Sequence, residues 1–211
     1  MWDTLPKPWK VCLDEAWQAY CAGSLPIGAV IIGQDGEVLS RARNRRYERG
    51  NFPVGAKNQE IMHAELQSIL ALDDTDLPRA SAELYTTMEP CPMCLGTWFM
   101  SSMRVLHYAA RDPYAGSADL LQTTWYMQKK GKQTHGPEAP WLENILIGLI
   151  VETEIRNRGF FPNSVKSRWV SVLPEGVELG YLMAIDTKLT SLRQGVLPVE
   201  VAFHYLISEY T

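Results

Sequence analysis

Long hydrophobic runs and cysteines are both scarce in this sequence of 211 residues. The longest apolar stretch, Ile145 to Val151, is far shorter than the roughly 18 residues that a membrane-spanning helix needs. Met1 to Lys10 contains no hydrophobic signal core. Four cysteines are too few for a secreted disulfide framework. Together these absences predict a cytoplasmic protein with no membrane partner.

The sequence also lacks an excess of positive charge. Its 20 Lys and Arg residues stand against 24 Asp and Glu residues, which gives a net charge of −4. A general nucleic-acid binder is basic overall, so bulk charge does not indicate one. Two local clusters are basic: five arginines between Arg41 and Arg49, and the lysines of 129–132. Each cluster is interpreted either as a solvated loop surface or as a patch that contacts phosphates beside a site.

The hydrophobic pattern predicts helices that alternate with strands. A helix over 7–22 and a β-hairpin over 27–40 come first; a helix over 62–70, a strand over 83–88, a helix after Pro90 and strands over 104–110 and 145–151 follow. This order predicts a three-layer α/β/α fold with a mixed five-stranded sheet. Apolar stripes over 182–192 and 199–207 predict two further helices. We therefore expect a domain of residues 1–160 and a helical C-terminal extension of residues 161–211.

Three residues have the chemistry and spacing of zinc ligands: His63, in the segment HAE, and Cys91 and Cys94, in the segment PCPMC. Catalytic zinc has three protein ligands and an open fourth position for water, whereas structural zinc has four protein ligands. Cys12 and Cys21 lie nine residues apart on one predicted helix. They therefore face opposite sides, and at most one of them could complete a closed site. The ligand count favours catalytic zinc, with one ion per chain.

Glu65 stands two residues after the histidine. Residues two apart diverge by about 200° within a regular helix, so we expect His63 at the start of its helix, where both side chains reach one pocket. The cysteines are predicted in the first turn of another helix, whose partial positive charge favours the thiolates that bind metals. In that pocket, Glu65 would accept a proton from the zinc-bound water and return it to a leaving amine.

Five segments, in order along the chain, resemble the tRNA adenosine deaminase-like (TadA-like) branch of the cytidine deaminase superfamily. They are PIGAV at 26–30, ARNR around Asn44, HAE at 63–65, LYTTMEPCPMC at 84–94 and AARDPYAG at 109–116. The HAE and PCPMC segments together resemble the zinc-binding signature of zinc-dependent nucleobase deaminases. The resemblance covers about residues 7–160.

The resemblance implies a cytidine deaminase-like fold and hydrolytic release of ammonia from a nucleobase. It implies that the three ligands hold one Zn²⁺, with water as the fourth ligand, and that Glu65 shuttles the proton. It also implies that Asn44 and the backbone amide of Ala64 contact the base and that Asp112 contacts a ribose. A homodimer is expected, and the first candidate reaction is conversion of adenosine to inosine, with tRNA as a candidate substrate.

The residues after 160 leave a second hypothesis open. The tRNA enzymes of this branch usually end soon after the last helix, whereas residues 161–211 add four basic and five acidic residues and no phosphate-binding charge. The substrate could instead be a free base, nucleoside or nucleotide, such as guanine, cytosine or deoxycytidylate. The 112–141 loop and the C-terminal helices would then close the pocket. A third hypothesis is a non-catalytic scaffold subunit, against which the presence of Glu65 argues.

Overall fold

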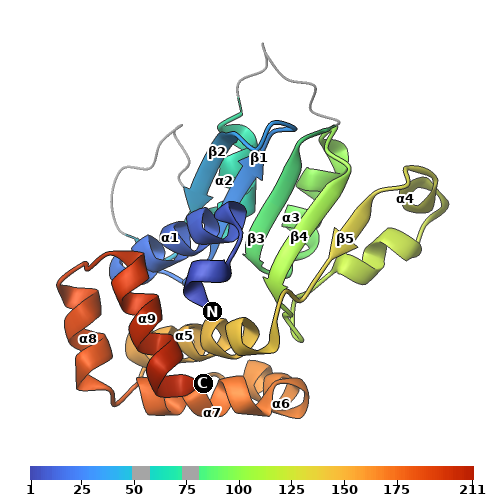
Figure 1. The fold of residues 1–211 in the computed structure, drawn as a ribbon. Coiled ribbons are helices and arrows are strands. Elements are labelled where there is room, and N and C mark those ends of the chain that lie inside the picture. The colour runs from blue at the N-terminus through green and yellow to red at the C-terminus, as the bar shows by residue number, and fades with distance from the viewer. Residues whose placement is uncertain (49–57, 73–80) are drawn as a thin grey trace.

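The computed structural model describes residues 1–48, 58–72 and 81–211. Its strands are β1 (Gly28–Ile32), β2 (Val38–Arg43), β3 (Glu83–Met88), β4 (Val105–Ala110) and β5 (Gln133–His135). Its α-helices are α1 (Lys7–Cys21), α2 (Ala64–Leu70), α3 (Pro92–Met100), α4 (Trp125–Lys129), α5 (Pro140–Arg158), α6 (Asn163–Val172), α7 (Pro174–Met183), α8 (Thr187–Gln194) and α9 (Val199–Tyr210). Short 3₁₀ helices cover Trp2–Thr4, Gln59–Ile61 and Ala118–Gln122. Figure 1 shows the C-terminal helices α6 to α9 gathered beside α5 at one end of the sheet.

The five strands form one mixed sheet in the order β2-β1-β3-β4-β5. β1 pairs antiparallel with both β2 and β3, whereas β3, β4 and β5 run parallel to one another. Parallel neighbours require crossover connections, and α3 provides the one between β3 and β4. The predicted mixed five-stranded sheet is confirmed.

Alternating side chains of the sheet belong to two separate hydrophobic clusters. On β1, Val30 and Ile32 pack into the cluster formed with α1 and α5. Ala29 and Ile31 point to the opposite face, into the cluster formed with α2 and α3. Because successive strand residues face opposite sides, this alternation places a helical layer on each face of the sheet. The predicted three-layer α/β/α arrangement is confirmed.

The prediction of a strand over 145–151 is wrong, because these residues lie within the 19-residue helix α5. Ile145, Ile147, Leu149 and Val151 are all buried, since the sheet covers one side of the helix and α7 covers another. A helix buried on several sides loses its amphipathic pattern and resembles a buried strand in sequence. The fifth strand is β5, inside the segment that was predicted to be mainly loop. Within the described ranges, no helix is long and apolar enough to cross a membrane.

The extension contains four helices rather than the two predicted. The stripe over 182–192 is broken at Asp186, whose carboxylate accepts hydrogen bonds from the backbone N–H groups of Lys188 and Leu189 and so begins α8. Buried residues of α5 and of the extension, such as Val177 and Phe203, belong to one hydrophobic cluster. The division of the chain at residue 160 therefore stays a prediction about folding units.

Glycines on α7 allow it to approach α5 closely. A Cβ atom at Gly176 would lie 2.7 Å from the Cβ of Ile147, and one at Gly180 would collide with the Cβ of Val151. Both obstacles are branched side chains on a packed helix, so neither yields easily. Gly96 in α3, by contrast, has no described atom within 4 Å of its ideal Cβ position apart from its chain neighbours and the nearby backbone of its own helix.

The same substitution should therefore have opposite effects at two helical glycines. Gly180→Ala should lower the free energy of unfolding by about 1–3 kcal/mol, because the added methyl group overpacks the α5–α7 contact. Gly96→Ala should raise it by up to about 1 kcal/mol, because alanine has the higher helix propensity. Urea unfolding measures both changes. A Gly180→Ala protein as stable as the wild type would contradict the close contact.

Candidate active site

The candidate ligands lie at the N-termini of two helices on the same face of the sheet. His63 is the residue that immediately precedes α2, and Cys91 occupies the same position before α3. Cys94 follows in the first turn of α3. Pro92 begins this helix, at a position where a backbone N–H would have no partner within the helix, so proline is tolerated there. The side chain of Gln67 donates to the carbonyl oxygens of Met62 and His63 and so holds the turn before α2. The structure thus places His63 at a helix start, as its spacing from Glu65 requires.

The three ligand atoms converge with the separation that zinc needs. Nδ1 of His63 lies 3.6 Å from Sγ of Cys91 and 3.5 Å from Sγ of Cys94, and all three atoms lie within 4.8 Å of one another. Tetrahedral zinc with Zn–S bonds of about 2.3 Å and Zn–N bonds of about 2.0–2.1 Å separates sulfur from nitrogen by roughly 3.6 Å. The residues therefore fit a zinc ion without rearrangement.

The two thiols have different acidities. A hydrogen bond from Cys94 and the neighbouring His63 lower the pKa of the Cys91 thiol to about 4, against the opposing effect of burial. The same contact with Cys91, together with burial, raises the pKa of Cys94. The pair therefore favours one thiolate beside His63, and binding of a metal by both sulfur atoms requires loss of the second thiol proton.

Glu65 lies in the first turn of α2, and its side chain is almost completely buried. Burial raises the pKa of its carboxyl group, while His63 acts in the opposite direction. Its Oε2 atom has no hydrogen-bond partner among the described residues. Because a buried carboxylate oxygen normally has a partner, the orphaned atom indicates a site for a bound molecule.

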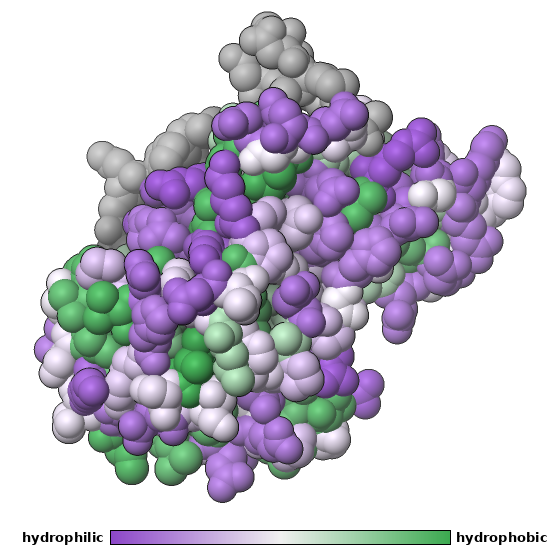
Figure 2. All heavy atoms as spheres, viewed as in Figure 1, coloured by the Kyte–Doolittle hydropathy of each residue, from purple (hydrophilic) through white to green (hydrophobic). Residues whose placement is uncertain are grey.

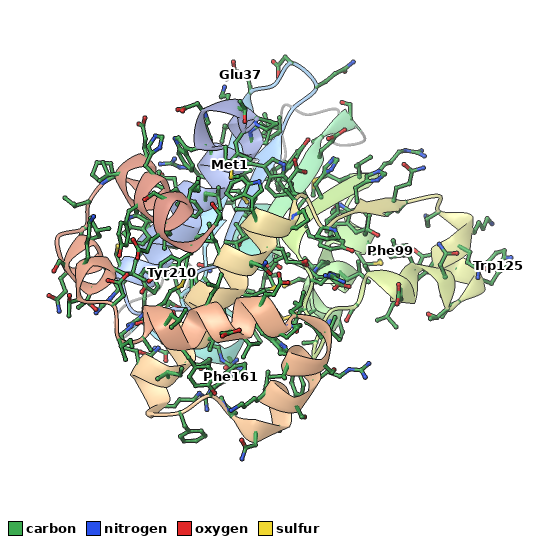
Figure 3. The ribbon with its side chains drawn as sticks, turned by 60° about the horizontal axis from the view of Figure 1, so that its bottom comes forward. Met1, Glu37, Phe99, Trp125, Phe161 and Tyr210 are labelled. Atoms are coloured by element: carbon green, nitrogen blue, oxygen red, sulfur yellow. The ribbon has the colours of Figure 1, made fainter. Side chains whose placement is uncertain are left out.

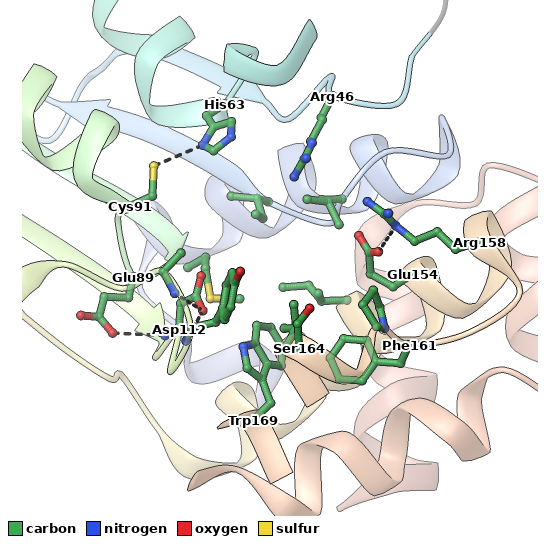
Figure 4. A pocket seen from close by; sticks show the side chains of 18 of the residues that line it. Arg46, His63, Glu89, Cys91, Asp112, Glu154, Arg158, Phe161, Ser164 and Trp169 are labelled. Atoms are coloured by element: carbon green, nitrogen blue, oxygen red, sulfur yellow. Dashed lines mark hydrogen bonds and ion pairs between the residues drawn. The ribbon is translucent and has the colours of Figure 1, made fainter. Parts of the chain in front are cut away.

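A cavity of about 370 Å³ opens beside these residues. His63, Glu65 and Cys91 line it, together with Asp112, and Figure 4 shows His63 and Cys91 along one side. Cys94 is fully buried behind them and does not belong to the described lining. The cavity therefore brings the predicted ligand site, the predicted acid–base residue and one predicted substrate residue into one space.

The other predicted substrate residues, Asn44 and Ala64, adjoin residues that line the cavity. Asn44 and Ala64 are fully buried and are not among the described residues that line it. The Asn44 Oδ1 atom accepts hydrogen bonds from Ser24 Oγ at 2.8 Å and from the backbone N–H of Arg46 at 3.0 Å. Its Nδ2 atom has no partner in the described part of the chain. Asn44 thus has a turn-stabilising role and an unused donor at the same time.

Asp112 belongs to a rigid loop. Its carboxylate accepts hydrogen bonds from the backbone N–H groups of Tyr114 at 2.9 Å and Ala115 at 3.0 Å, and burial raises its pKa. Glu89 holds the same loop through the N–H groups of Asp112 and Ala118. A Cβ atom at Gly116 would collide with the Glu89 carboxylate and would lie 2.5 Å from the backbone carbonyl oxygen of Asp112, which cannot easily move, so this position requires glycine. The loop therefore presents Asp112 to the cavity in a fixed position.

Sequence reasoning found no functional residue in the opposite wall of the cavity. That wall consists of α6 and the residues before it, including Phe161, Ser164 and Trp169. The exposed aromatic residue Trp125 is not part of the described cavity lining. It lies at an outlying tip of the molecule in Figure 3, is 70% exposed, and its ring contacts Lys129. Phe160 and Phe161, beside Pro162 and directly before a helix start, are the sequence signal that could have indicated this wall.

The three-ligand geometry makes a testable prediction about metal content. The purified protein should contain one zinc per chain, and His63→Ala and Cys94→Ala should each lose most of it, because two ligands hold zinc far more weakly than three. Cys21→Ala is the matched control and should retain zinc. Elemental analysis after dialysis measures this. Zinc retained by both ligand variants, or lost from Cys21→Ala, would contradict the site.

Comparisons with known proteins place these residues in a family. The profile of the cytidine and deoxycytidylate deaminase zinc-binding region matches residues 5–110. A tRNA-specific adenosine deaminase of Agrobacterium fabrum is 36% identical over 114 residues, which are 52% of this chain and 68% of that protein. A tRNA(Ile)-lysidine synthase of Deinococcus radiodurans is 35% identical over 116 residues, which are 52% of this chain and only 19% of that protein.

A solved structure from a study of A-to-I editing by tRNA:A34 deaminases is 32% identical to this chain, covers 53% of it and 80% of the solved chain, and has a TM-score of 0.42. The family profile includes His63, Cys91 and Cys94 but ends before α5 and the extension. This profile match and the converging His-Cys-Cys cluster lead to one conclusion: the chain belongs to the cytidine and deoxycytidylate deaminase family defined by this zinc-binding region.

Proposed function

We propose that this protein is a zinc-dependent hydrolytic deaminase that releases ammonia from an amine-bearing nucleobase. The observation that carries the proposal is the position of Glu65, which has an unpartnered buried oxygen and lines the same cavity as His63 and Cys91. Zinc held by His63, Cys91 and Cys94 would act as a Lewis acid and make water nucleophilic at neutral pH.

The residues of this chain would manage the proton and the substrate. Glu65 would accept a proton from the attacking water and deliver it to the leaving nitrogen. A C–O bond forms and a C–N bond breaks, so the ring amine leaves as ammonia and the ring carbon becomes a carbonyl. Asn44 and the Ala64 amide would orient the base, and Asp112 would accept a hydrogen bond from the substrate. The raised pKa of Glu65 suits a group that both accepts and donates this proton.

The relatives and the cavity support different substrates. The relatives named tRNA-specific adenosine deaminase support adenosine-to-inosine conversion as the first candidate reaction. The wall that α6 adds to the cavity favours the second candidate, a free base, nucleoside or nucleotide. The scaffold hypothesis is disfavoured, because a scaffold needs neither Glu65 nor a complete ligand set.

The proposal also includes a homodimer in a reducing, cytoplasmic compartment. All four cysteines are free, and the site needs two of them as thiolates. Figure 2 shows apolar side chains gathered over the C-terminal helices, and Ile185 and Val196 are 79% and 64% exposed there. Light scattering at micromolar concentration tests the dimer, and a monomer would remove that part of the proposal.

Replacing Glu65 tests the proposed reaction. Glu65→Gln should lower kcat for ammonia release by about 10²–10⁴-fold, because the amide cannot transfer the proton. Zinc content should not change, since Glu65 is not a ligand. Glu200→Gln, at an exposed position on α9, is the matched control and should keep full activity. If Glu65→Gln kept more than a tenth of the activity, the proposed proton transfer would be wrong.

A further inference from the structure

Helix α6 takes a direct part in the candidate active site, although it lies outside the part of the chain matched by the family profile. Phe161, Pro162, Ser164, Val165 and Trp169 line the cavity. Figure 4 shows Phe161, Ser164 and Trp169 across from His63 and Cys91. Pockets that bind small molecules measure about 300–1,000 Å³, so the volume of about 370 Å³ is at the lower end of that range. The residues of α6 are therefore placed to contact whatever occupies the cavity.

Trp169 carries an unused hydrogen-bond donor in this wall. The residue is only 4% exposed, and its Nε1 atom has no partner among the residues that the structure describes. Figure 4 shows the indole beside Asp112. Burial raises the pKa of that carboxyl, and the nearby indole N–H opposes the rise without forming a hydrogen bond of normal geometry. Buried tryptophans usually find a partner, as Trp17 does with the carbonyl of Leu197 at 2.7 Å.

The wall is fixed in place by contacts on both sides. The Phe161 ring packs edge-on against Trp169, with ring centroids 5.8 Å apart. Arg168 donates to the backbone carbonyl of Pro113 at 3.2 Å, which ties α6 to the loop that carries Asp112. The donor of Trp169 and the acceptor of Asp112 are thus held together as a pair at one end of the cavity.

The charges around the cavity oppose a phosphate chain. Glu89, Asp112 and Glu154 line it. The two arginines among the described lining residues both form ion pairs: Arg46 pairs with Glu60 at 2.6 Å, and Arg158 pairs with Glu154. An RNA strand needs cations for the phosphates on each side of the reacting nucleotide.

Arg41, Arg43 and Lys132, three members of the two basic clusters, are engaged by other groups of the protein. Arg41 pairs with Glu15 at 3.1 Å, and Arg43 pairs with Glu48 at 3.0 Å, while Arg49 lies outside the described residues. Lys132 donates to the backbone carbonyls of Trp98, Ser101 and Met103, and so stabilises the end of α3. These contacts favour a structural role for Arg41, Arg43 and Lys132 over contact with phosphates.

We infer that α6 restricts the substrate to a free, uncharged nucleobase or nucleoside, and that the Trp169 indole N–H and the Asp112 carboxylate bind its polar edge or its sugar. This inference rests on the proposed deaminase function and names the substrate class of the same site. The apolar residues Phe161 and Val165 would cover the ring on the side away from the metal ligands.

The test measures ammonia release by the zinc-loaded full chain from tRNA, adenosine, adenine, guanosine, guanine, cytidine, cytosine and their 5′-monophosphates. We expect kcat/KM for at least one free base or nucleoside to exceed that for tRNA and for the monophosphates by more than tenfold. Trp169→Phe, which keeps an aromatic ring without the N–H, should raise KM for that substrate by about five- to tenfold. Its kcat should change by less than about twofold.

Val170→Ala, on the exposed side of the same helix, is the matched control and should leave both constants unchanged. Calorimetric titration of the Glu65→Gln protein with the best substrate, with and without Trp169→Phe, measures binding independently of turnover. The substrate ratio of the wild type needs no variant, so poor folding of Trp169→Phe cannot hide the result.

The outcomes separate the two proposals. Preference for tRNA or a monophosphate, with ammonia release intact, overturns the inference and leaves the deaminase function standing. Equal KM and binding for Trp169→Phe and Val170→Ala overturn the role of the indole N–H. No ammonia from any substrate, with zinc bound, overturns the deaminase function and the inference together. Preference for a free base or nucleoside that weakens in Trp169→Phe alone supports the inference.

Discussion

The N-termini of α2 and α3 have to meet, because the atoms that can hold zinc come from the residues that begin these two helices. His63 and Cys91 each precede a helix, and Cys94 follows one turn later. This meeting requires both helices to pack on the same face of the sheet, where Ala64 and Leu95 share one hydrophobic cluster. The sheet order fixes that packing, since β3 leads directly into α3 beside the central strands. Small errors in helix placement would separate the ligand atoms and also move Glu65.

The C-terminal extension contributes residues both to the hydrophobic core and to the lining of the candidate active site. α5 is covered by the sheet and by α7, so its burial depends on residues that lie far beyond the family match. The glycines at 176 and 180 permit that contact. Once α7 is docked on α5, α6 is held beside the cavity, where Trp169 faces the Asp112 loop. Fold stability and the shape of the pocket are thereby linked through one helix pair.

The sequence was sufficient to predict those features that depend on interactions between neighbouring residues. The zinc ligands and Glu65 lie in two short motifs, and helix starts are set by neighbouring residues such as Pro92. The prediction from sequence failed for α5, because a helix buried on several sides lacks the alternation of apolar and polar residues that reveals the 3.6-residue period. The useful signals there were Pro140 at the first helical position and Gly159, whose φ of 82° ends the helix. Trp169 could not be found, because only the tertiary packing brings it to the cavity.

X-ray absorption spectroscopy of the zinc-loaded protein tests the central claim most directly, because catalysis requires a metal position that the protein leaves open. The account predicts zinc with two sulfur ligands at about 2.3 Å, one imidazole nitrogen at about 2.0–2.1 Å and one further oxygen from solvent. It also predicts that this oxygen signal changes when a nucleobase ligand is added. Four protein ligands, whether from a third sulfur or a second imidazole, would show a closed structural site and contradict the account.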